Sequence, residues 1–319
     1  MRKLLALAAT GALALGPAAC GNEEDSDASG GSGGGDLSGN IRIDGSSTVG
    51  PFAQAAAEQF KGEHPGVKIS VGTSGTGGGF EKFCAGETDI SDASRPIKPD
   101  EEAPLCKKKG ITYQEVHVAN DGIAVVTNPE LKVDCLTVEQ LNELWNEGSK
   151  ITKLSEIDPK LPDTELSLFG PGTDSGTFDF FTDQINGEEG ASRDDYQPSE
   201  DDNVTVQGVS GDENGLGYFG FSYYEQNQDK LNLVGVDGGD GCVKPSLEAI
   251  QTGKYKPLSR PLFMYPSEKA MARPEVAAFM EYVNANHDTI SKAAQIVPLT
   301  TEQSGKAKKA LETAERNAG

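Results

Sequence analysis

From residue 41 onward, short apolar segments alternate with stretches of helical periodicity. This alternation is typical of α/β proteins, in which strands form sheets and helices cover them. The expected strands are 41–43, 67–71, 89–94, 165–169, 204–209, 231–236 and 261–265, with one or two more within 111–127. The expected helices are 52–60, 80–85, 137–147, 177–185, 275–296 and 303–316. The pattern predicts an α/β fold with mostly parallel sheets.

Length and charge narrow the possible functions. The 319 residues suit two domains. With 28 Lys and Arg against 50 Asp and Glu, the formal net charge is −22. We therefore expect no nucleic-acid partner, because phosphate backbones are held by stripes of Lys and Arg. A small anion is still compatible with this charge, since it needs only local hydrogen-bond donors.

The N-terminus reads as an export signal. A positive start is followed by thirteen apolar residues at 4–16, too few to span a bilayer comfortably. Small residues then precede Cys20, as in a bacterial lipobox, although an ordinary secretory signal with an incidental cysteine is the alternative. We expect residues 1–20 to be a lipoprotein signal peptide ending at lipidated Cys20, and the Gly-, Ser- and acid-rich residues 21–39 to be a flexible tether. The chain would then be exported and lipid-anchored to the outer face of the bacterial cell membrane.

Four cysteines remain after Cys20: Cys84, Cys106, Cys135 and Cys242. An even number in an exported chain indicates two disulfides, for which three pairings exist. We favour Cys84–Cys106 with Cys135–Cys242, because the first pair closes a short loop within one segment. A zinc site is not expected, because no two cysteines have CxxC spacing and the chain has three histidines. We expect no metal and no cofactor.

Residues 188–203 differ from the rest of the chain. They contain seven acidic residues and few apolar ones. We expect a solvated surface insertion there.

Three glycine-rich turns each follow an expected strand and open an expected helix. They are 45–50 (GSSTVG), 73–79 (TSGTGGG) and 170–177 (GPGTDSGT). A helix N-terminus has free N–H groups and a partial positive charge, and glycine lets the backbone approach a ligand. Each turn alone is explained by helix capping. Three such turns converging would instead hold a tetrahedral oxyanion. None is a Walker A loop or a GxGxxG fingerprint.

A fourth segment, 89–96, adds charge. Arg95 offers a bidentate fork suited to phosphate or sulfate. Asp92 offers an acceptor, which suits hydrogen phosphate because that anion carries a proton, whereas sulfate at neutral pH does not. The alternative is an Asp–Arg pair at the surface that contributes little.

These segments resemble PstS-type phosphate-binding proteins, the lipid-anchored receptors of high-affinity phosphate ABC transporters. The matching blocks run in family order from residue 41 to about 298. They read GSSTVGPFAQAAAEQF, VGTSGTGGGFEKFCAGETDISDASRPI, ELWNEGSKIT, LFGPGTDSGTFDFF and NGLGYFGFSYY. No single block is specific, but their combination is.

The resemblance implies a two-lobed periplasmic binding protein of type II-like architecture. Each lobe would be a mixed sheet flanked by helices, with the ligand in the cleft between lobes. The chain would cross between lobes near Thr127 and near Arg260. Lobe one would comprise 40–126 and 261–319, and lobe two 127–260.

The resemblance also implies a set of phosphate contacts. In the first turn these are Thr48 and the Val49 backbone, with Ser47 adjacent. In the second turn Thr76 matches the family's contact serine, with Ser74 as the alternative, and the third turn supplies Ser175, Gly176 and Thr177.

One departure concerns the cation of the site. The best-known branch has an arginine four residues before Ser175, where this chain has Pro171. We expect Arg95, beside Ser94, to take over that role. The acceptor of the ligand's proton is left open, with Asp92 first and Asp174 second.

The implied function is extracytoplasmic, high-affinity binding of inorganic phosphate and its delivery to an ABC importer by hinge closure. The expected partners are phosphate, the membrane permease subunits and, through the lipid, the membrane itself; the protein would be a monomer. One alternative keeps the fold but binds sulfate or another oxyanion. Another is a secreted phosphatase, which would need a nucleophile and a base. Neither Ser74 nor Ser175 lies in GxSxG, so we expect no enzyme.

Overall fold

The computed structural model describes residues 37–173, 175–199 and 201–319. The expected signal peptide, lipidated Cys20 and the second candidate acceptor Asp174 lie outside the described residues. The first strand begins at Ser38, so it includes the last two residues of the expected tether.

Strands and helices alternate through most of the chain, as expected. The strands are β1 Ser38–Gly45, β2 Gly66–Gly72, β3 Ile90–Ala93, β4 Val116–Thr127, β5 Cys135–Thr137, β6 Ser167–Pro171, β7 Gln197–Ser199, β8 Gly215–Gly220, β9 Asn232–Asp237, β10 Cys242–Val243 and β11 Ser259–Pro266. The helices are α1 Gly50–Glu63, α2 Gly75–Cys84, α3 Glu102–Lys108, α4 Val138–Trp145, α5 Gly176–Phe181, α6 Asp202–Gly211, α7 Phe221–Glu225, α8 Leu247–Gln251, α9 Glu268–Met271, α10 Pro274–Ala285, α11 His287–Ala293 and α12 Thr301–Ala318. A 3₁₀ turn, η1 Leu154–Glu156, and a π-helical turn, η2 Thr182–Asn186, complete the described elements.

The sheet is mixed. Its strands follow the order β2-β1-β3-β11-β4-β8-β6-β7, and β9 joins β4 to β5 and β10. The pairs β1–β2, β1–β3, β6–β7, β6–β8 and β5–β9 are parallel. The pairs made by β4 and β11, and the β9–β10 pair, are antiparallel. The expectation of mostly parallel sheets is therefore wrong, because the two strands at the centre of the path run against their neighbours.

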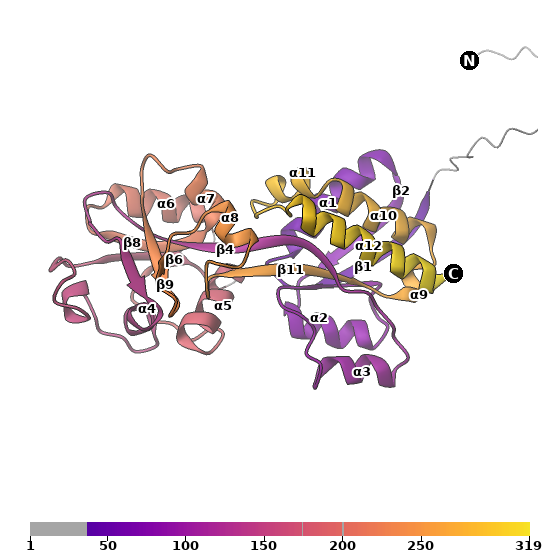
Figure 1. Cartoon of the computed structure of the whole chain (residues 1–319), viewed down its shortest axis with the longest axis horizontal. Coiled ribbons are helices and arrows are strands. Elements are labelled where there is room, and N and C mark those ends of the chain that lie inside the picture. The colour runs from indigo at the N-terminus through magenta and orange to yellow at the C-terminus, as the bar shows by residue number, and fades with distance from the viewer. Residues whose placement is uncertain (1–36, 174, 200) are drawn as a thin grey trace, which may run out of the picture. The chain divides into compact units, whose positions relative to one another are not determined.

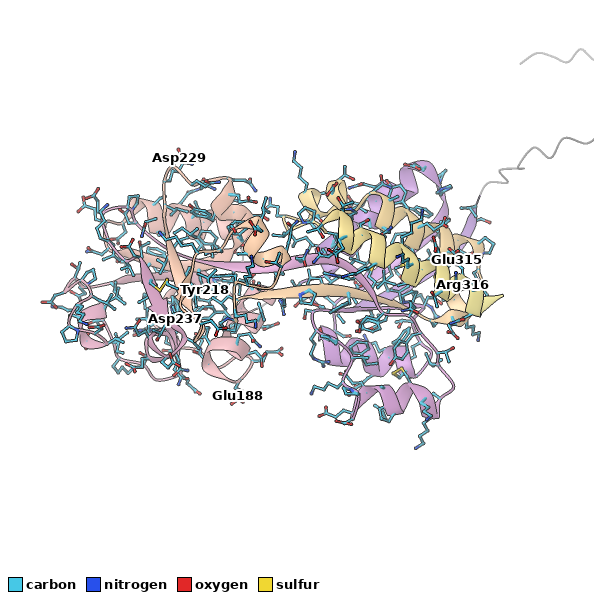
Figure 2. The ribbon with its side chains drawn as sticks, in the orientation of Figure 1. Glu188, Tyr218, Asp229, Asp237, Glu315 and Arg316 are labelled. Carbon is cyan, nitrogen blue, oxygen red and sulfur yellow. A yellow bond between two sulfur atoms is a disulfide. The ribbon has the colours of Figure 1, made fainter. Side chains whose placement is uncertain are left out.

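Two separate apolar cores define two lobes. Lobe one surrounds Phe52, Phe60 and Phe279, with a smaller cluster under α2 and α3. Lobe two surrounds Trp145 and Tyr218, and Tyr218 lies among its side chains in Figure 2. These clusters consist of buried apolar side chains, so each lobe is stabilised by its own hydrophobic core.

The long strands β4 and β11 run between the lobes (Figure 1). On β4, Gly122 still pairs with Ser259 of β11, whereas Ile123 pairs with Gly220 of β8. The partner of β4 therefore changes after Gly122, and β11 pairs with β4 from Ser259 onward.

Both expected disulfides are formed. Cys84–Cys106 joins the end of α2 to α3 in lobe one, and Cys135–Cys242 joins β5 to β10 in lobe two. The predicted pairing is confirmed.

The strand expected at 204–209 is wrong, because these residues belong to α6. Asp201 caps this helix by accepting a hydrogen bond from the Asn203 N–H. Val206 and Val209 are buried three residues apart, which is helical spacing, whereas Val204 is 53% exposed. The apparent alternation of Val204 with Val206 therefore had no structural meaning.

The acidic segment 188–203 is only partly a surface insertion. Glu188 points outward (Figure 2), but Arg193 is 5% exposed. The Arg193 guanidinium donates to the carbonyls of Leu144 at 2.8 Å and Ile151 at 3.0 Å. This buried arginine anchors the segment to lobe two.

The helix expected at 275–296 is broken at Asn286 into α10 and α11.

Candidate functional site

A cavity of about 680 Å³ lies between the two lobes. All three glycine-rich turns contribute to its wall, as the sequence predicts. The first turn supplies residues 46–48, the second supplies 74–78, and the third supplies Gly176. Ser94, Arg95 and Arg260 line it as well. The turns therefore converge on one cavity although they belong to different lobes.

The first turn is shaped by a close approach of β1 to β3. A side chain at Gly45 would collide with the backbone of Asp92. The Ser46 N–H donates to the Asp92 carbonyl at 3.0 Å, and Ser46 Oγ accepts from the N–H groups of Thr48 and Val49 at 3.2 and 3.4 Å. The Val49 N–H is thus satisfied within the turn, and its side chain is buried away from the cavity.

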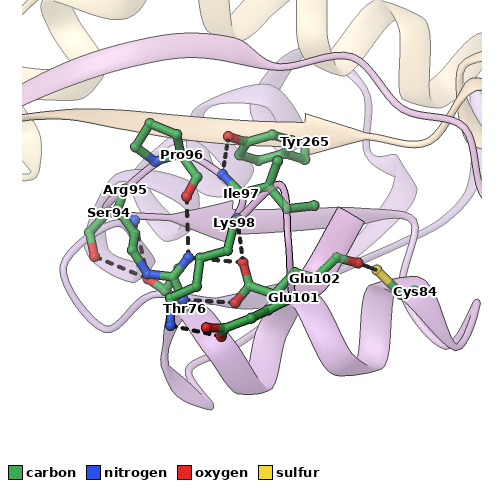
Figure 3. A network of polar contacts seen from close by, with 10 residues as sticks. All are labelled: Thr76, Cys84, Ser94, Arg95, Pro96, Ile97, Lys98, Glu101, Glu102 and Tyr265. Carbon is green, nitrogen blue, oxygen red and sulfur yellow. Dashed lines mark hydrogen bonds and ion pairs between the residues drawn. The ribbon is translucent and has the colours of Figure 1, made fainter. Parts of the chain in front are cut away.

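The two hydroxyl groups of the second turn have different hydrogen-bond partners. The Ser74 hydroxyl donates to Asp44, whose other oxygen accepts from Lys82 Nζ at 2.7 Å. Burial alone would raise the Asp44 pKa, but these hydrogen bonds lower it. The Thr76 hydroxyl instead lies 3.0 Å from the Ser94 hydroxyl, and both residues line the cavity (Figure 3). Thr76 is therefore better placed than Ser74 to offer a hydroxyl to a ligand.

Arg95 lines the cavity, but its guanidinium group is paired with another side chain of lobe one. Its two terminal nitrogens donate to the carboxylate of Glu102 at 2.9 and 2.7 Å, the bidentate arrangement seen in Figure 3. The hydrogen bond to Glu102 raises the Arg95 pKa, while burial opposes it. Since Glu102 occupies the fork within lobe one, the geometry does not support Arg95 as the free cation that the sequence suggested.

Arg260 is the cation that sequence reasoning missed. It lies on β11 directly opposite Asp121 of β4, and its Nε contacts an Asp121 oxygen at 3.2 Å. Its Nη2 donates to Thr48 Oγ1 at 2.7 Å and to the Gly176 carbonyl at 3.2 Å. The sequence marks position 260 only as a crossing between lobes, because its partners are 84 or more residues away along the chain.

Asp92 is buried behind the first turn, on β3. The side chain is 0% exposed, and neither carboxyl oxygen has a hydrogen-bond partner among the described residues. Burial, and secondly the charge of Asp44, raises the Asp92 pKa well above its usual range. A buried polar group without a partner is costly and is characteristic of a functional site.

The third turn caps α5 and touches the first turn. Ser175 is the N-cap residue, and its Oγ accepts from the Thr177 N–H at 3.2 Å. A Cβ atom at Gly176 would lie 2.9 Å from both Ser47 Oγ and the Thr48 N atom. The two lobes therefore meet here at a distance that only glycine allows.

Lobe two also contributes acidic side chains to the cavity wall, namely Asp179, Asp183 and Glu189. Burial lowers the pKa of Arg260, while the charges of Asp179 and Asp183 act to raise it. An anion is disfavoured beside carboxylates, so the hydroxyls and N–H groups of the turns are where it would bind.

The chain was compared with known proteins. A family model described as a PBP superfamily domain matches residues 30–286. The phosphate-binding protein PstS of Staphylococcus saprophyticus is 44% identical over 235 residues, which are 73% of this chain and 72% of that protein. The chain belongs to the PstS-type phosphate-binding proteins of the PBP superfamily.

Other relatives of this PstS-type chain agree. Protein SphX of Synechocystis is 45% identical over 267 residues, covering 82% of this chain and 79% of that protein. The crystal structure of a possible phosphate binding protein from Planctomyces limnophilus is 44% identical, with a TM-score of 0.82 over 87% of this chain and 99% of that one. The two-lobed α/β fold implied by the resemblance is confirmed.

The expected contact residues of the PstS-type site fall into two groups. Those that line the cavity are Ser47, Thr48, Ser74, Thr76, Ser94, Arg95 and Gly176. Those that are not part of the lining are Val49, Asp92, Ser175 and Thr177, of which Val49 and Asp92 are buried. The first group is brought together from four segments of the chain.

Within 37–173, 175–199 and 201–319, none of the helices combines the length and apolar character required to traverse a bilayer. The same residues contain no group of three or more His, Cys, Asp or Glu side chains that could hold a metal ion.

Proposed function

We propose that this protein binds inorganic phosphate in the cavity between its lobes. The observation that carries the proposal is the convergence of glycine-rich turns from both lobes on one cavity, where the hydroxyls of lobe one lie near a buried, unpartnered carboxyl group, Asp92. The relatives support it, since one solved structure that is 28% identical, from Clostridium perfringens, is a putative phosphate ABC transporter substrate-binding protein with bound phosphate (TM-score 0.57).

Asp92 gives the site a means of preferring phosphate. Burial, and secondly the charge of Asp44, raises the pKa of Asp92, so this carboxyl group keeps its proton to a higher pH than an exposed aspartate does. Hydrogen phosphate brings a proton of its own, so it can bind whether Asp92 is neutral or ionised. Sulfate brings none, so it requires a neutral Asp92, and an ionised Asp92 would repel it.

Binding would act by closing the hinge. The first turn belongs to lobe one and the third to lobe two, and they meet at Gly176. An anion that bridges both turns gains its full set of contacts only in the closed form, so it shifts the population toward closure. We propose that lobe one comprises 38–122 with 259–319, and lobe two 123–258, because β4 changes partner after Gly122 and β11 begins at Ser259.

The cellular role follows from the same proposal. The protein would be exported, anchored through lipid on Cys20 to the outer face of the cell membrane, and monomeric. In its closed form it would present phosphate to the permease subunits of an ABC importer, and it would perform no chemistry on the anion.

The ligand that the protein carries when purified tests this role. The protein is purified without phosphate or sulfate in any buffer, then denatured, and the released anions are measured by ion chromatography. We expect close to one phosphate per chain from the wild type and much less from a Thr76→Val, Ser94→Ala double variant. Release of sulfate in place of phosphate would reject the proposed ligand.

A further inference from the structure

Arg260 touches both lobes at once. Through Nη2 it donates to Thr48 Oγ1 in the first turn and to the Gly176 carbonyl in the third. It also lines the cavity between these turns. Arg260 can contact both turns because it lies on β11, the strand that crosses between the lobes.

Besides its contacts with Thr48 and Gly176, the guanidinium group is held by a carboxylate and an aromatic ring. Asp121 accepts from Nε across the β4–β11 pair, and both side chains are largely buried, at 12% and 9% exposed. The guanidinium carbon lies 3.8 Å from the centre of the Phe180 ring. A stacked and paired guanidinium is pre-organised, so little side-chain entropy is lost when it binds an anion.

We propose that Arg260, and not Arg95, is the arginine that contacts the bound phosphate, and that Asp121 is the residue that positions it. This inference rests on the proposed function, because it names a contact of the same site. The terminal nitrogens of Arg95 are paired with Glu102. The N–H groups of Arg260 Nη1, in contrast, have no hydrogen-bond acceptor among the described residues.

Arg260 also determines how Thr48 can act. Since Thr48 Oγ1 accepts a hydrogen bond from Nη2, its own O–H must point elsewhere. Thr48 lines the cavity, so its hydroxyl is available as a donor to a ligand oxygen. One arginine thereby provides a charged donor and sets a second, neutral donor beside it.

The test compares two arginines of one cavity by titration with phosphate. Replacing a charge-assisted donor should weaken binding by about 10- to 150-fold in Arg260→Gln. The matched control Arg95→Gln should change the affinity by less than about threefold. Arg260→Lys, which keeps the charge but loses the fork, should be intermediate. Equal effects of the two Gln variants, with a wild type that binds phosphate, would overturn the assignment of Arg260.

A second pair of variants separates binding from folding. Arg260→Gln leaves Asp121 buried and unpaired, so it is combined with Asp121→Asn to remove both charges. The double variant should unfold at nearly the wild-type temperature and still bind phosphate weakly. If it recovers wild-type affinity, Arg260 is only a structural residue and the inference is wrong.

The coupling between Arg260 and Thr48 gives a third readout. Thr48→Val should weaken binding in the wild-type background but have a smaller effect in Arg260→Gln, because the hydroxyl is then no longer oriented. Strictly additive effects would contradict this coupling. A wild type that binds no phosphate at all would instead reject the proposed function, and the two failures are therefore distinguishable.

Discussion

Replacing Asp92 by asparagine should change how the stability of the ligand-free protein depends on pH. The carboxyl group is completely buried, has no hydrogen-bond partner among the described residues, and has a pKa raised by burial and by the charge of Asp44. Its ordinary value is 3.8. Above that pH the unfolded chain carries an ionised Asp92, whereas the folded chain must keep it protonated.

The sign and size of the effect follow from proton linkage. The stabilising contribution of a group with a raised folded pKa is complete below the unfolded pKa and is lost as the pH rises toward the folded pKa. Because folding takes up one proton in this window, Asp92 lowers the free energy of unfolding by about 1.4 kcal/mol per pH unit. The amide introduced by Asp92→Asn does not titrate, so the variant lacks this slope. Burial of that amide adds only an offset that is independent of pH.

The assay is urea unfolding of both proteins, free of phosphate, at intervals from about pH 4.5 to pH 8. The difference in free energy of unfolding, variant minus wild type, should rise by about 1.4 kcal/mol for each pH unit and become constant at the folded pKa of Asp92. Asp163→Asn is the matched control, since this carboxylate is exposed and hydrogen bonds lower its pKa; its difference should not rise with pH. A difference that is constant with pH for Asp92→Asn would refute the reasoning.

Three further outcomes are expected. Gly176→Ala should weaken phosphate binding by about 5- to 150-fold, because its Cβ would overlap Ser47 and Thr48 in the closed form; titration measures this, and unchanged affinity would contradict the closure geometry. The affinity ratio of phosphate to sulfate should increase as the pH passes the folded pKa of Asp92, because the ionised carboxylate rejects sulfate; a ratio that falls with rising pH would exclude Asp92 from the site. Arg193→Ala should lower the free energy of unfolding by about 2 to 4 kcal/mol, because two buried carbonyls lose their donor, while leaving phosphate affinity unchanged in the same titration.

The sequence predicts the parts of the site that depend on local structure. Each glycine-rich turn lies between a strand and a helix that neighbouring residues specify, and such a turn can be read from a short window. From the residues alone, the convergence of the turns was only a condition for an anion site, and the resemblance to a family of binding proteins implied it. The resemblance to known proteins then indicated which turns belong to which lobe.

The parts that were missed depend on contacts between distant segments. Arg260 acts on Thr48 and Gly176, which lie 212 and 84 residues away, and nothing near it in sequence indicates this. Arg95 was assigned to the ligand because its guanidinium fork suits phosphate and because Pro171 stands where the best-known branch has an arginine. Only the fold shows that Glu102, at the start of α3, takes its guanidinium group.

A strand was predicted where α6 lies, for a related reason. Val204 and Val206 have strand-like spacing, but lobe two buries the face that carries Val206 and Val209. Packing against β6 and β8, and not the local hydrophobic pattern, determines that this segment is a helix.

The most direct test of the account is calorimetric titration of residues 37–319 with phosphate and then with sulfate at pH 8. The protein is first unfolded with its disulfides intact and refolded, so that any bound anion is removed. We predict saturable heat with one phosphate per chain and weaker binding of sulfate. No heat with phosphate, or tighter binding of sulfate than of phosphate, would contradict the assignment of this cavity as a phosphate site.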